Sequence, residues 1–135
     1  NKHFSVSDIE LKRQGISYTY DTVLALKKEY GDMYELYFVI GADSVPELDT
    51  WHKVREIMSI CTFVAATRPG FAPTVEKVIK YFGELGKNRI KWMDTPEMDI
   101  SSTDIRHRIQ TNTSIEGLVP AEVAEYIYQK GLYRS

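Results

Sequence analysis

The segment Asp99–Arg106, which reads DISSTDIR, combines hydroxyl side chains with an arginine at a spacing that suits a bound phosphate. Ser102 is a good helix N-cap, with Ser101 and Thr103 on either side of it, and the amides at a helix start attract anions. Arg106 follows on nearly the same helix face, where its guanidinium can bind the same anion through two parallel hydrogen bonds. A well-capped helix with a solvated arginine explains the spacing equally well.

A second candidate lies where the apolar run Glu35–Ile40 stops at Gly41. A glycine at the end of a strand lets a ligand approach the backbone closely, and Asp43 could accept hydrogen bonds from ribose hydroxyls. The alternative is that Asp43 or Ser44 caps a short helix around Val45–Leu48. Taken alone, the loop favours the helix cap.

Three further side chains each have a binding and a structural interpretation. Trp51 could stack on a flat ring, although an aromatic residue more often packs in or near a core. Thr19 can cap a helix whose first amides would bind a carboxylate. Arg68 precedes a Pro-Gly turn, where it would either meet a phosphate or stand exposed. His52 and His107 have no acid or base partner at readable spacing, and we interpret them as surface or packing residues.

Apolar segments with alternating strand and helix character separate these candidates. Strands are predicted for the ranges His3–Leu11, Glu35–Ile40, Thr62–Thr67 and Arg89–Met93. Helices are predicted for the ranges Tyr20–Tyr30 (capped by Thr19 and ended by Gly31), Trp51–Ser59, Thr74–Leu85, Ser102–Gln110 and Pro120–Gly131. The alternation indicates an α/β fold with a parallel sheet covered by helices on both faces. Ligands of such sheets bind beyond the carboxyl ends of the strands, where Gly41 and Arg68 fall.

The composition is ordinary for a soluble chain and argues against several functions. The length of 135 residues fits one hydrophobic core, and the net charge of −2 argues against a general nucleic-acid binder. One cysteine and three histidines indicate neither an intrachain disulfide nor a metal site, which favours a cytoplasmic location. The longest apolar runs are too short to cross a membrane.

Taken together, the loops match a known family. The elements SYTYDTV, FVIGADSVPELDTW, TRPG, DISSTDIR and GLVPAEVAEYIYQKGLY occur in this order over essentially the whole chain. They resemble bacterial nicotinate mononucleotide adenylyltransferases, which belong to the nucleotidyltransferase superfamily and have a Rossmann-like fold. The resemblance implies transfer of AMP from ATP to nicotinate mononucleotide, with Mg²⁺, which gives deamido-NAD and pyrophosphate in NAD biosynthesis.

The resemblance also implies a role for each candidate residue, according to its place in these motifs. The ATP phosphates would be held by Ser101, Ser102, Thr103 and Arg106, of which Arg106 is the catalytic side chain. The ribose at the junction of the two nucleotides would contact Gly41 and Asp43. Nicotinate mononucleotide would bind Tyr18, Thr19, Trp51 and Arg68. Its pyridine ring would stack on Trp51, its carboxylate would meet the amides of Tyr18 and Thr19, and its phosphate would lie near Arg68.

One family element has no counterpart in this sequence. The family begins with a strand and a loop of the type GGxFDPxHxGH, whose histidines bind phosphates. In this sequence His3, His52 and His107 belong to no HxGH pair. We therefore expect residues 1–135 to be the C-terminal portion of a single nucleotidyltransferase domain, without its first strand and helix, and to be inactive alone. A chain of this kind would leave strand edges exposed.

Two other hypotheses remain open. A related adenylyltransferase would act on nicotinamide mononucleotide or phosphopantetheine instead. A non-catalytic nucleotide-binding fragment would keep the acceptor pocket and half of the phosphate site without turnover. The sequence indicates no nucleic-acid or membrane partner, and it leaves the oligomeric state open, a homo-oligomer included.

Overall fold

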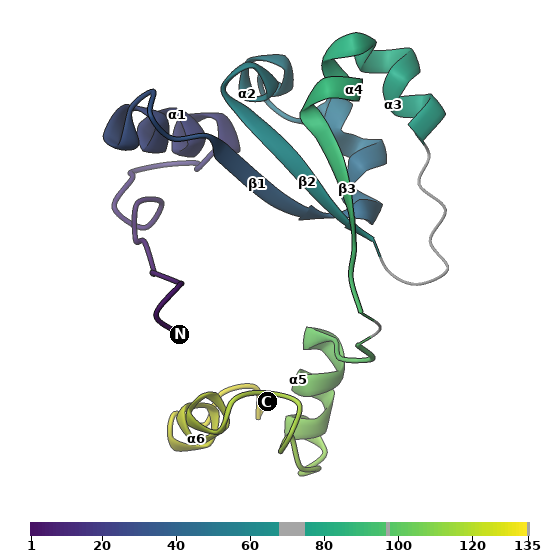
Figure 1. Ribbon diagram of the computed structural model, residues 1–135. Helices are drawn as coiled ribbons and strands as arrows, with labels where there is room; N and C mark the ends of the chain where they lie inside the picture. The colour runs from purple at the N-terminus through teal and green to yellow at the C-terminus, as the bar shows by residue number, and fades with distance from the viewer. Residues whose placement is uncertain (68–74, 97, 135) are drawn as a thin grey trace. The chain divides into compact units, whose positions relative to one another are not determined.

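The computed structural model describes residues 1–67, 75–96 and 98–134. The chain forms two compact units, Asn1–Pro96 and Glu97–Ser135, and each is described separately below. The first unit holds all the strands drawn in Figure 1, and the second is helical. The phosphate-binding segment predicted around Arg106 therefore belongs to a different unit from the predicted acceptor-binding residues.

The first unit is built on a parallel sheet of three strands in the order β1-β2-β3. The strands are β1 (Leu36–Gly41), β2 (Cys61–Thr67) and β3 (Ile90–Asp94). Each lies within about a residue of a predicted strand, so the expected α/β architecture is confirmed for this part of the chain. The carboxyl ends of all three strands meet at one edge of the sheet, as parallel pairing requires.

One face of this sheet is covered by helices and holds the core. The covering elements are α1 (Thr19–Tyr30), the 3₁₀ helix η1 (Ala42–Thr50), α2 (Val54–Ile60), α3 (Val75–Phe82) and α4 (Glu84–Arg89). Phe63 of β2, Leu48 of η1 and Ile57 of α2 are completely buried in the core. Burying an apolar side chain of this size contributes about 1.5–3 kcal/mol, so this layer supplies most of the stability of the unit.

The opposite face of the sheet is open in the described part of the chain. Tyr37 and Val39 of β1 are 50% and 63% exposed, and Met93 of β3 is 44% exposed. These residues alternate with the core residues, and paired residues of parallel strands share a face. The expectation of helices on both faces is therefore wrong for the described residues.

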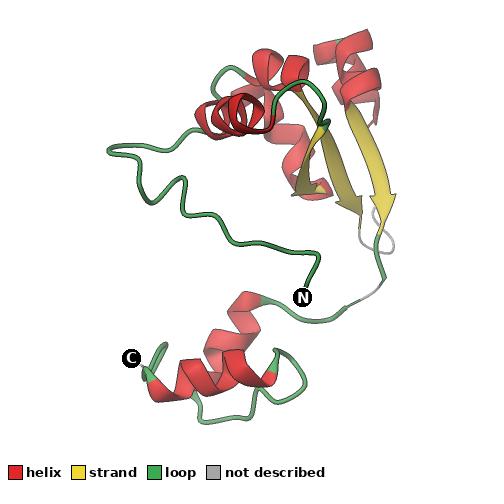
Figure 2. Cartoon of the chain, turned by 60° about the vertical axis from the view of Figure 1, so that its left-hand side comes forward, coloured by secondary structure: helices red, strands yellow, loops and turns green. Residues whose placement is uncertain are grey.

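The N-terminal segment forms no strand, contrary to the prediction for His3–Leu11. Figure 2 shows it as loop, and its apolar side chains, such as Phe4 and Val6, are exposed. An ion pair of 2.9 Å between Lys12 Nζ and Asp8 Oδ1 instead accompanies a short turn. Alternating apolar residues favour a strand only where a neighbouring strand and a buried face are available, and this segment has neither within the described residues.

The starts of two helices differ from the predictions. Helix α1 begins at Thr19 itself, with Tyr18 as its N-cap, so Thr19 does not cap the helix. Its end at Gly31, where φ is 75°, is confirmed. Helix α2 begins only at Val54 because Lys53 adopts a left-handed conformation with φ of 52°. The predicted helix Trp51–Ser59 therefore starts three residues late, and the tryptophan lies in extended backbone.

The single helix predicted for Thr74–Leu85 is broken into two. Gly83 has a φ of 60°, which ends α3 and allows α4 to start in a new direction. The amide of Gly83 donates to the carbonyl of Ile79, which completes the last turn of α3. The first residue of the prediction, Thr74, lies outside the described residues.

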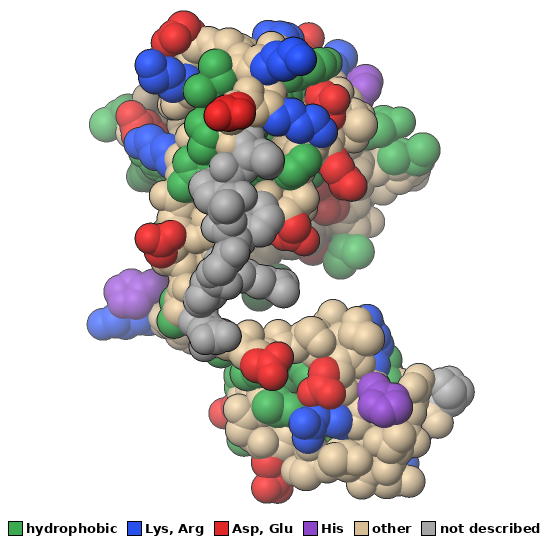
Figure 3. Space-filling view, turned by 90° about the vertical axis from the view of Figure 1, so that its right-hand side faces the viewer, with side chains coloured by type: hydrophobic (Ala, Val, Ile, Leu, Met, Phe, Trp, Pro, Cys, Tyr) green, Lys and Arg blue, Asp and Glu red, His purple; other side chains and the backbone are tan. Residues whose placement is uncertain are grey.

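The second unit consists of α5 (Ser102–Gln110) and α6 (Ala121–Gln129). Four buried residues form its core: Ile109, Ile115, Ala124 and Ile127. Both predicted helices are present, although α6 begins at Ala121 with Pro120 as its N-cap. Gly131, with φ of 61°, follows the end of α6 as expected. On the view in Figure 3, acidic and basic side chains are interspersed over each unit. Within the described ranges, no helix combines the length and apolar character that crossing a bilayer requires.

Candidate nucleotide-binding site

A small pocket lies where the start of α1 faces the end of η1. Its volume is about 260 Å³. It is lined by Ser17, Tyr18, Thr19, Thr50, Trp51 and His52, and we call it the aromatic pocket. The pocket brings together Tyr18, Thr19 and Trp51, which come from segments about 30 residues apart in the sequence. All three were predicted to bind the same ligand.

Trp51 is fixed in the aromatic pocket by the covered face of the sheet. Its backbone amide donates to the carbonyl of Leu48 at 3.1 Å, which closes the last turn of η1. Its indole packs edge-on against Phe38 and Phe63, with ring centroids 6.1 and 5.8 Å away. Edge-to-face contacts of this kind hold a ring in one orientation. The structure therefore supports both interpretations of Trp51, as a packing residue and as a pocket wall.

The first turn of α1 brings backbone amides to the aromatic pocket. Tyr18 is the N-cap, and its side chain makes no capping hydrogen bond. The amide of Thr22 donates to the carbonyl of Tyr18, so the amides before it have no carbonyl within the helix. Such amides carry the positive end of the helix dipole, which suits a carboxylate. Thr22 also ties the preceding loop to the helix, since its hydroxyl donates to Glu10 at 2.7 Å.

Gly41 and Asp43 meet at the carboxyl end of β1. A Cβ atom added to Gly41 would lie 2.5 Å from Oδ1 of Asp43. The glycine is therefore needed for the close approach of this carboxylate, since its own φ of −67° is ordinary. Asp43 is exposed and can accept hydrogen bonds from a ligand. Neither Asp43 nor Ser44 makes a capping hydrogen bond to η1, so the helix-cap interpretation is wrong.

Thr67 joins the ends of β2 and β3 through contacts that were not predicted. Its hydroxyl lies 2.9 Å from Oδ1 of Asp94 and 3.2 Å from the carbonyl oxygen of Met93. In return, the hydroxyl and the amide of Thr95 both donate to the carbonyl of Thr67. No sequence signal reveals this pairing, because it depends on the register of two separate strands. Arg68, the next residue, was predicted to bind a phosphate and lies outside the described residues.

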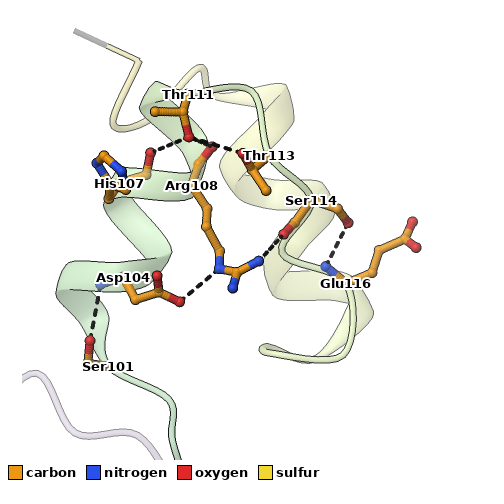
Figure 4. Close-up of polar contacts among 8 residues, drawn as sticks. All are labelled: Ser101, Asp104, His107, Arg108, Thr111, Thr113, Ser114 and Glu116. Carbon is orange, nitrogen blue, oxygen red and sulfur yellow. Dashed lines mark hydrogen bonds and ion pairs between the residues drawn. The ribbon is translucent and has the colours of Figure 1, made fainter.

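The N-cap of α5 is Ser101, whereas the sequence predicted Ser102. The hydroxyl of Ser101 accepts a hydrogen bond of 3.1 Å from the amide of Asp104, as Figure 4 shows. Ser102 and Thr103 are consequently the first two helical residues. Their amides have no acceptor within the helix, and their side chains are exposed. Ser101, Ser102 and Thr103 thus form the N-cap and the start of α5, and Arg106 follows one turn further along the helix.

The acidic residue in the first turn of α5, Asp104, is paired with an arginine. Arg108 Nε lies 2.8 Å from Asp104 Oδ2, and Figure 4 shows this pair on the side of the helix that faces the loop through Ser114. Arg106 is exposed, and its guanidinium lies 3.5 Å from the hydroxyl of Thr103. Because Asp104 is paired with another arginine, Arg106 keeps its positive charge available near the first turn.

The cysteine is not a candidate for nucleophilic chemistry. Cys61 is 2% exposed at the start of β2, and burial raises the pKa of its thiol to about 11 against a smaller opposing effect of Arg89. A thiol of this kind is protonated and unreactive at neutral pH. The described residues also contain no group of three His, Cys, Asp or Glu side chains that could hold a metal ion.

Comparison with known proteins defines the class. The Cytidylyltransferase-like family matches residues 1–108, and the chain belongs to that family. Similar relatives include the probable nicotinate-nucleotide adenylyltransferases of Moorella thermoacetica, 44% identical, and of Thermoanaerobacter sp., 42% identical, each over 99% of this chain. The chain spans only 62% and 64% of the length of these two relatives. The resemblance inferred from the sequence motifs is confirmed.

Solved structures agree with the fold. Two structures of the Plasmodium falciparum nicotinic acid mononucleotide adenylyltransferase, one complexed with APC and one with NaAD, match with a TM-score of 0.67 at 19% identity. Each covers 89% of this chain, and the chain covers 60% and 58% of them. At this level of identity the likeness concerns the fold, and the predicted Rossmann-like architecture is confirmed.

Proposed function

We propose that the complete protein transfers AMP from ATP to nicotinate mononucleotide, giving deamido-NAD and pyrophosphate. The observation that carries the proposal is the aromatic pocket, in which Trp51 lies beside the first turn of α1. An aromatic wall next to unpaired amides suits a flat ring that bears a carboxylate. The names of the relatives, probable nicotinate-nucleotide adenylyltransferases, support the same acceptor.

In this proposal the acceptor extends from the aromatic pocket along the carboxyl ends of the strands. The pyridine ring stacks on Trp51, and its carboxylate accepts hydrogen bonds from the amides of Tyr18 and Thr19. The carboxylate of Asp43, which Gly41 allows close to the backbone, accepts hydrogen bonds from ribose hydroxyls. Arg68 binds the acceptor phosphate.

The ATP phosphates bind at the start of α5. The amides and hydroxyls of Ser101, Ser102 and Thr103 hold the phosphates, and Arg106 places its guanidinium against them. An oxygen of the mononucleotide phosphate attacks the α-phosphorus of ATP in line. The bond from that phosphorus to the β-phosphate oxygen breaks, and pyrophosphate leaves with the electron pair. Arg106 is the catalytic residue, because its charge stabilises the negative charge of the departing group.

Mg²⁺ enters this proposal as the counter-ion of ATP. It binds proteins through one or two carboxylates while phosphate oxygens and water complete its shell. The exposed carboxylate of Asp43 fits such partial coordination, and the described residues contain no group of three or more His, Cys, Asp or Glu side chains that could hold the ion alone. When bound, the ion would supply charge neutralisation at the phosphates. We further propose that the two compact units act as one nucleotidyltransferase domain in the cytoplasm.

The test uses the protein expressed from its complete coding sequence. With ATP and Mg²⁺, we expect pyrophosphate release with nicotinate mononucleotide, weaker release with nicotinamide mononucleotide, and none with phosphopantetheine. Trp51→Ala should raise the KM for the mononucleotide about tenfold or more, since stacking on an aromatic side chain is worth about 1–3 kcal/mol. Trp92→Phe, on β3, is the matched control and should leave KM unchanged.

Two outcomes would contradict the proposal. Pyrophosphate release with neither mononucleotide would exclude the activity. Preference for phosphopantetheine would assign the pocket to another acceptor. A purely binding role would give affinity for the nucleotides without turnover. Calorimetric titration of the chain 1–135 with each nucleotide measures the affinity, and pyrophosphate release by the complete protein measures the turnover.

A further inference from the structure

His52 stands out among residues to which the proposed mechanism gives no part. It lines the aromatic pocket together with Tyr18 and Trp51. Its imidazole lies against the Tyr18 ring, with centroids 4.5 Å apart and planes inclined by 33°. Sequence reasoning missed it, because its ring partner lies 34 positions earlier in the chain. The stack is therefore a property of the fold.

The imidazole is free to meet a ligand. The residue is exposed, and within the described part of the chain neither ring nitrogen takes part in a hydrogen bond or an ion pair. Lys53, the neighbouring cation, is directed elsewhere, since its ammonium lies 4.7 Å from the centre of the Tyr20 ring. Asp21 is the acidic residue in the first turn of α1. The described residues that line the pocket include no Asp or Glu, so no acidic side chain among them would repel a bound carboxylate.

The chemistry of the donors distinguishes two acceptors of nearly identical shape. A carboxylate offers two oxygens that only accept hydrogen bonds, whereas a carboxamide replaces one oxygen by an NH₂ that only donates. Helix amides satisfy one oxygen of either group. An imidazole N–H that donates to the second oxygen of a carboxylate makes a charge-assisted hydrogen bond, which is about twice as strong as a neutral one. The uncharged carboxamide gains no such bond, so the imidazole favours the carboxylate.

We propose that His52 is a specificity-determining residue, whose imidazole N–H, held by the stack on Tyr18, binds the ring carboxylate and selects nicotinate over nicotinamide mononucleotide. The inference rests on the proposed function and refines it. The indole of Trp51 binds both rings alike, so the two side chains have separable effects: Trp51 sets the affinity for the ring, and His52 sets the choice between its substituents.

The test compares the two mononucleotides in the complete protein. His52→Phe keeps an aromatic ring against Tyr18 and removes the N–H. We expect the ratio of kcat/KM for nicotinate over nicotinamide mononucleotide to fall about tenfold, the usual effect of one hydrogen bond to a charged group. The change should lie in KM for the nicotinate form, with kcat nearly constant. His52→Gln, which keeps an N–H donor, should retain most of the ratio.

The controls separate this inference from the proposed function. Trp51→Phe should weaken both acceptors together and leave the ratio unchanged. An unchanged ratio in His52→Phe would overturn the role of His52 while the activity itself stands. If the wild-type complete protein acted on neither mononucleotide, the proposed function itself would be excluded. Calorimetric Kd values for the two mononucleotides give the same ratio without relying on turnover, so a slow variant still decides the question.

Discussion

At the scale of single residues, Gly41 matters because it has no Cβ atom. The carboxylate of Asp43 occupies the space in which a Cβ atom would lie. Gly41→Ala should therefore displace Asp43 while the backbone stays as it is, since the φ of −67° suits alanine. We expect kcat/KM for AMP transfer to fall about tenfold, as for loss of one ribose hydrogen bond. Steady-state pyrophosphate release measures it.

A double-mutant cycle identifies the cause of that loss. If displacement of Asp43 is responsible, Gly41→Ala should cost little in a protein that already carries Asp43→Ala. Additive losses from the two changes would mean that Gly41 acts independently of the carboxylate, for instance by direct approach of the ligand to the backbone.

The candidate site was partly predictable at this scale. Tyr18, Thr19 and Trp51 were found because they stand in motifs that resemble a family, and the structure places them in one pocket. Residue spacing alone left Trp51 ambiguous. The stack of His52 and the contacts of Thr67 were not predictable, because each depends on a partner from a separate segment.

At the scale of elements, the start of α5 depends on one hydroxyl. The hydroxyl of Ser101 accepts a hydrogen bond from the amide of Asp104, whereas Ser102 makes no capping hydrogen bond. Ser101→Ala should lower the free energy of unfolding of the second unit by about 1 kcal/mol. Ser102→Ala, its matched control, should change it by less than about 0.5 kcal/mol. Urea unfolding of both variants measures the difference, and equal effects would contradict this assignment of the cap.

The ends of β2 and β3 depend on the Thr67 hydroxyl. Thr67 is 4% exposed, and its hydroxyl faces the Asp94 carboxylate and the Met93 carbonyl. Thr67→Val removes the donor while keeping the shape, so we expect the free energy of unfolding to fall by about 1–3 kcal/mol. Thr62→Val is the control, because Thr62 lies on the same strand, is 8% exposed and donates no hydrogen bond to another described residue. Similar losses in both variants would refute the argument.

The elements themselves were mostly predictable, and the exceptions have physical causes. Buried apolar runs indicated all three strands, and glycine ended α1 where expected. Gly83 was not recognised as a break, because an isolated glycine is also tolerated within a helix. The left-handed Lys53, which delays α2, carries no sequence signal at all, since lysine rarely adopts that conformation.

At the scale of the whole molecule, burial of Cys61 makes the free energy of unfolding depend on pH in the alkaline range. In the folded protein, burial raises the pKa of the thiol from its ordinary value of 9.0 to about 11. The unfolded chain loses this proton first, so the stabilisation is complete below about pH 9 and disappears as pH rises through about 11. The free energy of unfolding should fall more steeply over this interval in the wild type than in Cys61→Ala, by about 2–3 kcal/mol in total.

That comparison isolates the thiol, because the two proteins differ only at residue 61. Unfolding in urea at several pH values between pH 8 and 11 gives the two slopes. Parallel curves would mean that the thiol proton is held no more tightly in the folded protein than in the unfolded chain.

The edge-on packing of Trp51 against Phe38 and Phe63 has an optical consequence. The chain contains two tryptophans, and the other, Trp92, is partly buried against the core of the first unit. In Trp92→Phe, all indole emission comes from the wall of the aromatic pocket. A stacked pyridine ring would quench that emission, so occupancy of the pocket could be followed in real time as a decrease in tryptophan fluorescence.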